Sequence, residues 1–268
     1  MEHVRIEQAG GVAVVTLENP PVNALAEQTF QELAQAFDVL SGDRTVGAAV
    51  LTAAGDRAFC AGVDLRDSPL RYRTDGRRSD GGPQVDPRAQ TDPGRVVRAC
   101  FRSIYDCAVP VIAAVDGKAI GAGMALVACC DLVIASPRAS FALTEINVGV
   151  LGGVRHAQRL VGPHLARRMF YTGEFVGADE LYRRGSIEAV VTSEEVLPAA
   201  RALAATIASK SPIAVRLAKE SANRVEPLPL MEGYRVEQDY TQRVRRHADA
   251  DEAREAFLAK RAPEFRWE

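Results

Sequence analysis

The stretch VPVIAAVDGKAIGAGMALVACC, residues 109–130, contains an apolar run, a turn with three glycines and a second apolar run. Val109 to Val115 is rich in β-branched residues and predicts a buried strand, and the second run predicts a helix. Val46 to Thr52 starts another segment of this kind, again followed by a glycine-bearing turn and a helical segment. Repeated strand, turn and helix segments predict an α/β core.

The rest of the chain divides into a β-rich start and a helical end. Val4 to Glu7 and Val12 to Leu17 flank two glycines, which is the spacing of a hairpin. Glu27 to Leu40 has apolar residues at a period close to that of an amphipathic helix. We therefore expect a core at residues 1–196 and a helical C-terminal region at 197–268, with helices at Leu197 to Ser209, Pro212 to Arg224, Leu230 to Val244 and Ala250 to Lys260.

Residues 66–95 are rich in Arg, Asp, Gly and Pro and have few aliphatic side chains. Such a composition buries too little apolar surface to order itself, so we expect a mobile surface loop. Its arginines could meet a phosphate group or could simply be solvated.

The composition disfavours several classes of partner. The chain has 268 residues, and 33 Lys and Arg oppose 35 Asp and Glu, so no excess charge favours nucleic acid or an anionic membrane. No run reaches the ~18 apolar residues of a membrane span, and the first residues lack a secretory signal, so we expect a soluble, cytoplasmic protein. The five cysteines lack C-x-x-C spacing, and we expect buried thiols and no metal site.

Two turns after strands could expose backbone amides to one ligand. They are Arg57 to Leu65 and Gly117 to Gly123, both built from small residues. If the turns face each other, their N–H groups can bind one developing oxyanion, where each donor typically contributes about 3 to 4 kcal/mol in the transition state. Neither turn matches a nucleotide-binding fingerprint.

Five motifs together resemble the enoyl-CoA hydratase/isomerase, or crotonase, superfamily over nearly the whole chain. They are AFCAGVDL (58–65), DGKAIGAG (116–123), TEINVGV (144–150), QRLVG (158–162) and FLAKRAPEF (257–265). The resemblance implies a crotonase (ClpP-like) spiral of ββα units with a helical C-terminal trimerisation region. It also implies a homo-oligomer, a trimer or a hexamer of two trimers.

Carried over by position, the resemblance assigns the oxyanion amides to Val63 and to Ala122, beside Gly121, and the acid–base role to Glu145. It implies an acyl-CoA thioester as the substrate, so that CoA arrives on the substrate and no separate cofactor is needed. The implied CoA contacts are Val22 and Ala61 along the bound molecule, Arg57 and Arg66 at its phosphates, and Phe257 and Lys260 reaching the CoA of a neighbouring subunit.

One departure from the family bears on the reaction. Hydratases of the family use two glutamates, but Ala125 occupies the position of the second one. A lost general acid or base typically costs about 100- to 10,000-fold in rate, which disfavours hydration by that route. Since one carboxylate suffices for a 1,3-proton shift, we expect an enoyl-CoA isomerase-like enzyme.

Three alternatives stay open. The first is hydration with a replacement group such as His156, and the second is water-dependent C–C cleavage of a cyclic β-keto thioester. The third is a non-catalytic relative that binds acyl-CoA or RNA.

A second departure is that Arg155 and His156 stand where relatives commonly have two glycines. They could recognise a carboxylate or ketone on the acyl group, or His156 could be a second acid–base group. Helix capping or surface packing explains them equally well. Asp64 and Asp131 also match acidic positions of the family, and we expect both to be structural.

Overall fold

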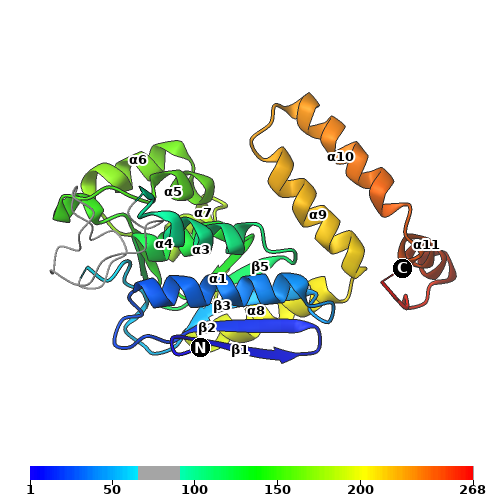
Figure 1. Ribbon diagram of the computed structural model, residues 1–268, viewed down its shortest axis with the longest axis horizontal. Coiled ribbons are helices and arrows are strands. Elements are labelled where there is room, and N and C mark those ends of the chain that lie inside the picture. Colours follow the sequence, from blue (N-terminus) through cyan, green and yellow to red (C-terminus); the bar gives the residue numbers. More distant parts are fainter. Residues whose placement is uncertain (66–90, 268) are drawn as a thin grey trace.

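The computed structural model describes residues 1–65 and 91–267, and it places their strands in two sheets (Figure 1). The six-stranded sheet has the order β1-β2-β3-β5-β7-β10, and the four-stranded sheet has the order β4-β6-β8-β9. The strands are β1 (Val4–Ala9), β2 (Val12–Leu17), β3 (Ala48–Ala53), β4 (Ala58–Cys60), β5 (Val111–Val115), β6 (Lys118–Ile120), β7 (Leu132–Ala135), β8 (Ser140–Ala142), β9 (Val176–Gly177) and β10 (Ala189–Val190).

The helices cover these sheets and continue beyond them at the C-terminal end. They are α1 (Glu27–Gly42), α3 (Arg95–Tyr105), α4 (Ala122–Cys129), α5 (Val154–Val161), α6 (Pro163–Thr172), α7 (Ala178–Arg183), α8 (Ser193–Ala208), α9 (Pro212–Val225), α10 (Leu230–Val244) and α11 (Ala248–Ala259), with a 3₁₀ helix, η1, at Glu145–Val148.

The chain repeats a ββα unit and winds as a spiral. The parallel neighbours β3, β5 and β7 lie in the six-stranded sheet, and the strands that follow them, β4, β6 and β8, are parallel neighbours in the four-stranded sheet. Each unit therefore adds one strand to each sheet before the chain continues into a helix. This arrangement confirms the predicted spiral of ββα units.

The central strands of the six-stranded sheet are buried on both faces. In β3, Ala49 and Leu51 pack on the side of α1, whereas Ala48 and Val50 pack on the side of α8. Side chains alternate along a strand, so a strand covered on both faces must be apolar at nearly every position. The continuous apolar runs in the sequence have this cause.

Most predicted elements are confirmed with small shifts at their ends. The first two strands form the expected antiparallel hairpin, with Val4 opposite Leu17. The predicted boundary between residues 196 and 197 lies inside α8, which begins at Ser193 and packs on the sheet. All five cysteines are buried and free, as expected for small apolar side chains.

The C-terminal boundary predicted for the loop at residues 66–95 is too late in the chain. Residues 66–90 lie outside the described residues, but Arg95 begins α3. This helix buries Cys100 and Ile104 and packs along α1, and these tertiary contacts outweigh the polar composition before it.

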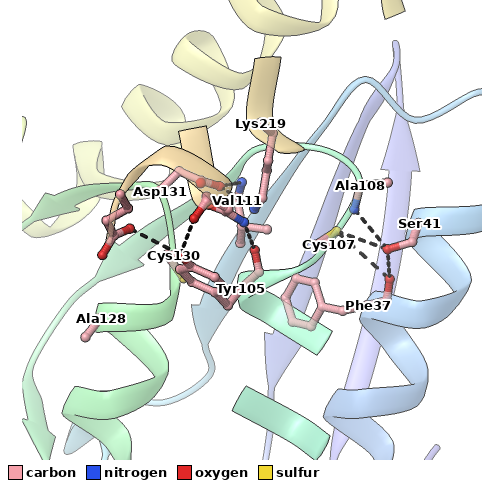
Figure 2. A network of polar contacts seen from close by, with 12 residues as sticks. Phe37, Ser41, Tyr105, Cys107, Ala108, Val111, Ala128, Cys130, Asp131 and Lys219 are labelled. Carbon is pink, nitrogen blue, oxygen red and sulfur yellow. Dashed lines mark hydrogen bonds and ion pairs between the residues drawn. The ribbon is translucent and has the colours of Figure 1, made fainter. Parts of the chain in front are cut away.

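A buried ion pair links helix α9 to the core (Figure 2). Lys219 Nζ lies 2.6 Å from Oδ2 of Asp131, and the same oxygen accepts the Val111 N–H at 2.7 Å. Asp131 thus joins the end of α4, the start of β5 and α9, which confirms its expected structural role.

The C-terminal helices extend away from the core. Helices α9 and α10 form a helical hairpin, and α11 lies at the far end of the molecule from α5 and α6 (Figure 1). No helix in the described ranges has the length and apolar character needed to cross a membrane.

Candidate active site

The two predicted turns pack against each other because they contain glycines. Gly62 has φ +93°, and a methyl group there would lie 3.0 Å from the Ile120 carbonyl oxygen and 3.8 Å from the Ala122 nitrogen. A methyl group on Gly123 would lie 2.8 Å from Cβ of Cys60. The turn after β4 and the turn after β6 are therefore in direct contact.

The N–H groups of Val63 and Ala122 are not used by the fold. Leu25 forms an isolated bridge with Val63, in which the Leu25 N–H bonds to Gly62 O and the Asp64 N–H bonds to Leu25 O. Ala122 is the first residue of α4, where a helix has no internal acceptor for the N–H. Among the described residues, neither amide donates a hydrogen bond.

Val63 is positioned by pairing with another segment. It lies in a β-bridge with Leu25, and a helix after this turn would begin beyond Leu65, outside the described residues. The bridge to Leu25, rather than a helix end, leaves the Val63 amide unused.

Glu145 lies against the second turn. A methyl group on Gly121 would be 2.5 Å from Oε1 of Glu145, and methyl groups on Gly152 and Gly153 would be 3.6 Å and 4.0 Å from the same oxygen. The Gly121 N–H donates to Ala142 O at 2.8 Å, which ties this turn to β8 just before η1. Three glycines therefore surround the carboxylate of Glu145.

The Glu145 carboxyl is partly desolvated. Its Oε2 is buried and has no hydrogen-bond partner among the described residues. Burial raises the pKa of this carboxyl above its ordinary value, and a hydrogen bond from its own backbone N–H offsets part of the rise. Ala125, one turn into α4, is buried and supplies no second carboxylate.

The remaining predicted CoA contacts are spread over the molecule. Val22 O accepts the Ala61 N–H at 3.0 Å, so these two half-buried residues adjoin the Gly62 turn. Arg57 is exposed just before β4, and Arg66 is outside the described residues.

The C-terminal pair lies apart from this site. Phe257 is 81% exposed on α11, and Lys260 follows the end of that helix with φ +54°. Within one chain, Figure 1 places α11 far from α4 and α5, so this chain's own α11 does not reach its Glu145.

Arg155 and His156 line a separate pocket of about 760 Å³. It is enclosed by α3, the end of α4, α5 and the end of α9, and the His156 ring packs on Phe101 with ring centroids 4.8 Å apart. Burial lowers the pKa of His156, and Arg155 and Arg159 lower it further, which keeps the imidazole neutral near pH 7.

The wall that α3 contributes to this pocket was missed by sequence reasoning. Arg95, Arg98 and Arg102 all line it. Their spacing of three and four residues marks one face of a helix, and that pattern would have found them had the helix been predicted. Within the described part of the chain, no group of three His, Cys, Asp or Glu side chains could hold a metal ion.

Comparison with known proteins agrees with this geometry. The family model described as "Enoyl-CoA hydratase/isomerase" matches residues 7–268. The chain is 38% identical to a (7aS)-7a-methyl-1,5-dioxo-2,3,5,6,7,7a-hexahydro-1H-indene-carboxyl-CoA hydrolase of Mycobacterium tuberculosis, over 93% of this chain and 96% of that protein. It is 32% identical to a crotonyl-CoA hydratase of Syntrophomonas wolfei, over 98% of each chain.

A solved structure shows the same fold. The enoyl-CoA hydratase from Bacillus anthracis superposes with a TM-score of 0.87 at 29% identity, covering 99% of this chain and 100% of that one. The chain therefore belongs to the enoyl-CoA hydratase/isomerase family, a family of acyl-CoA enzymes.

Proposed function

We propose that the protein binds an acyl-CoA thioester with its carbonyl oxygen between the N–H groups of Val63 and Ala122, and that Glu145 is the acid–base group. The two amides would stabilise the negative charge of the thioester enolate, which forms when a C–H or C–C bond to the α-carbon breaks and leaves its electron pair on that carbon. CoA enters as part of the substrate, with Val22, Ala61, Arg57 and Arg66 as its proposed contacts on this chain.

The main observation behind this proposal is the burial of the Glu145 carboxylate. A buried carboxylate oxygen without a hydrogen-bond partner is costly, and such cost is typical of groups that meet a ligand. This oxygen belongs to the side chain that touches the Gly121 turn, next to the unused Ala122 amide. An acid–base group on η1 and an oxyanion donor at the start of α4 thus lie next to each other.

The reaction that this single carboxylate supports best is a 1,3-proton shift. Glu145 would take a proton from one carbon of a 3-enoyl thioester, forming the conjugated enolate, and return it two carbons away to give the 2-enoyl isomer. Helix α4 has no carboxylate of its own, so addition of water by two glutamates lacks a second group there.

A second candidate reaction is hydrolytic C–C cleavage of a cyclic β-keto thioester. It is favoured by identities of 38% and 37% to two indene-carboxyl-CoA hydrolases, from Mycobacterium tuberculosis and Rhodococcus jostii. Water would add to the ring ketone, and the bond from the ketone carbon to the α-carbon would break. Its electron pair would form the same thioester enolate, Glu145 would protonate the α-carbon, and the ketone carbon would become a carboxylate.

Three thioesters distinguish the reactions: a 3-enoyl-CoA, a 2-enoyl-CoA and a cyclic β-keto acyl-CoA. Turnover of one of them by the wild-type protein identifies isomerisation, hydration or ring opening. The Glu145→Gln variant should lose about 100- to 10,000-fold in kcat, because the amide cannot accept a proton. Glu188→Gln, at an exposed position, is the matched control.

The pH profile gives the same experiment a second readout. Because burial raises the pKa of Glu145, the acidic limb of kcat/KM should lie above the range of an ordinary glutamate, which is about pH 4.3. If Glu145→Gln keeps wild-type turnover, the acid–base role is wrong. If the wild-type protein converts none of the three thioesters, it is better described as a non-catalytic acyl-CoA-binding protein.

We also expect the enzyme to act in the cytoplasm, since its buried, unpaired cysteines suit a reducing compartment.

A further inference from the structure

We propose that the pocket between α3 and α5 binds a carboxylate carried by the acyl group of the substrate, and that Arg155 is its principal ligand. This inference deepens the proposed function and rests on it. It names a substrate class, acyl-CoA thioesters with a second, negatively charged end.

Two helices run between the proposed oxyanion site and the pocket, along the path that the far end of an acyl group would have to take. Helix α4 begins at Ala122, beside the proposed oxyanion site, and its far end lines the pocket through Ala128 and Cys129. The six-residue step from Ala122 to Ala128 spans about 9 Å along the helix axis. Helix α5 follows Gly153, which adjoins Glu145, and it lines the same pocket through Arg155 and His156. Two helices therefore lead from the reacting centre into this pocket.

The lining of the pocket carries an excess of positive charge. Among the residues that the structure describes, five arginines line it and two lining residues are acidic, Asp92 and Glu226. A pocket of this charge favours an anionic ligand.

Three of the five guanidinium groups already have partners. Arg98 pairs with Asp92, and Arg102 pairs with Asp106 at 3.0 Å. Arg159 pairs with Glu226 at 3.0 Å and also donates to the carbonyls of Ala128 and Cys130, so it closes the end of α4.

Arg155 and Arg95 remain available. Neither side chain has a hydrogen bond or an ion pair with any described residue, and both line the pocket. Arg155 is the nearer of the two in sequence to the Gly152–Gly153 turn at Glu145. A guanidinium group can bind a carboxylate through two parallel hydrogen bonds, which makes Arg155 well suited to the role.

The other walls suit a carbon chain. Ala99, Phe101 and Ala128 give the pocket an apolar lining between the arginines. An acyl group that ended in a methyl group would bury part of these guanidinium groups without compensating their charge. An acyl group that ends in a carboxylate matches both the apolar walls and the Arg155 guanidinium.

The test compares two saturated thioesters of equal length, octanoyl-CoA and suberyl-CoA, which differ only in the terminal carboxylate. Titration calorimetry on the wild-type protein should show tighter binding of suberyl-CoA by about 10- to 100-fold, the range expected for a charge-assisted hydrogen bond. Arg155→Gln should abolish this preference, and Arg155→Lys should keep part of it. Arg167→Gln, at an exposed position on α6, should leave the preference unchanged.

The outcomes separate this inference from the proposed function. Equal binding of the two thioesters by the wild-type protein, or a preference that survives in Arg155→Gln, overturns the carboxylate pocket and leaves the acid–base role of Glu145 intact. Retention of the preference in Glu145→Gln is expected, because the two sites are distinct. If neither thioester binds, the proposed acyl-CoA function fails and the carboxylate pocket fails with it.

Discussion

At the scale of single residues, Gly121 leaves no room for a side chain beside Glu145. Its φ is +56°, a value that side-chain-bearing residues rarely adopt, and its missing side chain makes room for the Glu145 carboxylate. Any Cβ atom there would displace Oε1 of Glu145 or the turn that carries the Ala122 amide.

Gly121→Ala is therefore expected to reduce kcat by about 100-fold or more, since displacing a catalytic group by about 1 Å can have that effect. Gly10→Ala is the matched control, because Gly10 has φ +57° and nothing lies within 4 Å of a methyl group there. Both variants should lose roughly 1 to 3 kcal/mol of stability from backbone strain, measured by urea unfolding. Equal activity of the two variants would contradict the contact with Glu145.

At the scale of elements, an ion pair between Lys219 and Asp131 is one of several polar contacts that hold helix α9 to the core. The Lys219 side chain is only 3% exposed and that of Asp131 is 23% exposed, so little water solvates the pair. Losing one partner of a buried pair leaves an uncompensated charge, which costs more than losing a surface ion pair.

Lys219→Met should lower the free energy of unfolding by about 2 to 3 kcal/mol, somewhat below the range for a fully buried pair because Asp131 keeps the Val111 N–H and some solvent contact. Lys210→Met, at an exposed position after α8, should change it by less than about 0.5 kcal/mol. Chemical denaturation of the two variants side by side measures the difference. Similar stabilities would mean that other contacts attach α9.

The amphipathic helices α1, α9 and α10 were predicted almost to the residue, because their apolar period is clear in the sequence. Helix α3 was missed, because it directly follows a segment dominated by charged residues, glycine and proline. Only its packing along α1, with Cys100 and Ile104 buried, identifies it as a stable helix.

At the scale of the whole molecule, the last two helices, α10 and α11, expose large apolar side chains. Leu230 is 83% exposed, Met231 70%, Phe257 81% and Leu258 73%. Exposed apolar surface of this kind marks contact sites between proteins. We therefore retain the prediction of a trimer or hexamer, in which these helices contact other copies of the chain.

Sedimentation analysis should give a mass three or six times the chain mass of 28.9 kDa. Replacing Leu230 and Met231 together by Asp should shift the population toward smaller species, whereas Leu65→Asp, an exposed apolar position outside the C-terminal helices, should not. A monomeric wild-type protein would exclude the predicted assembly.

The α/β class, the hairpin and the amphipathic helices follow from the order of the amino acids alone, because local periodicity encodes them. Motif order likewise suffices to identify Glu145, Val63 and Ala122 as candidates. The folded chain was needed to show that Gly62 packs on the Gly121 turn, that three glycines surround Glu145, and that Arg155 shares a pocket with α3. Contacts between segments far apart in the chain depend on how the two sheets and their helices pack, and no local pattern of residues contains that information.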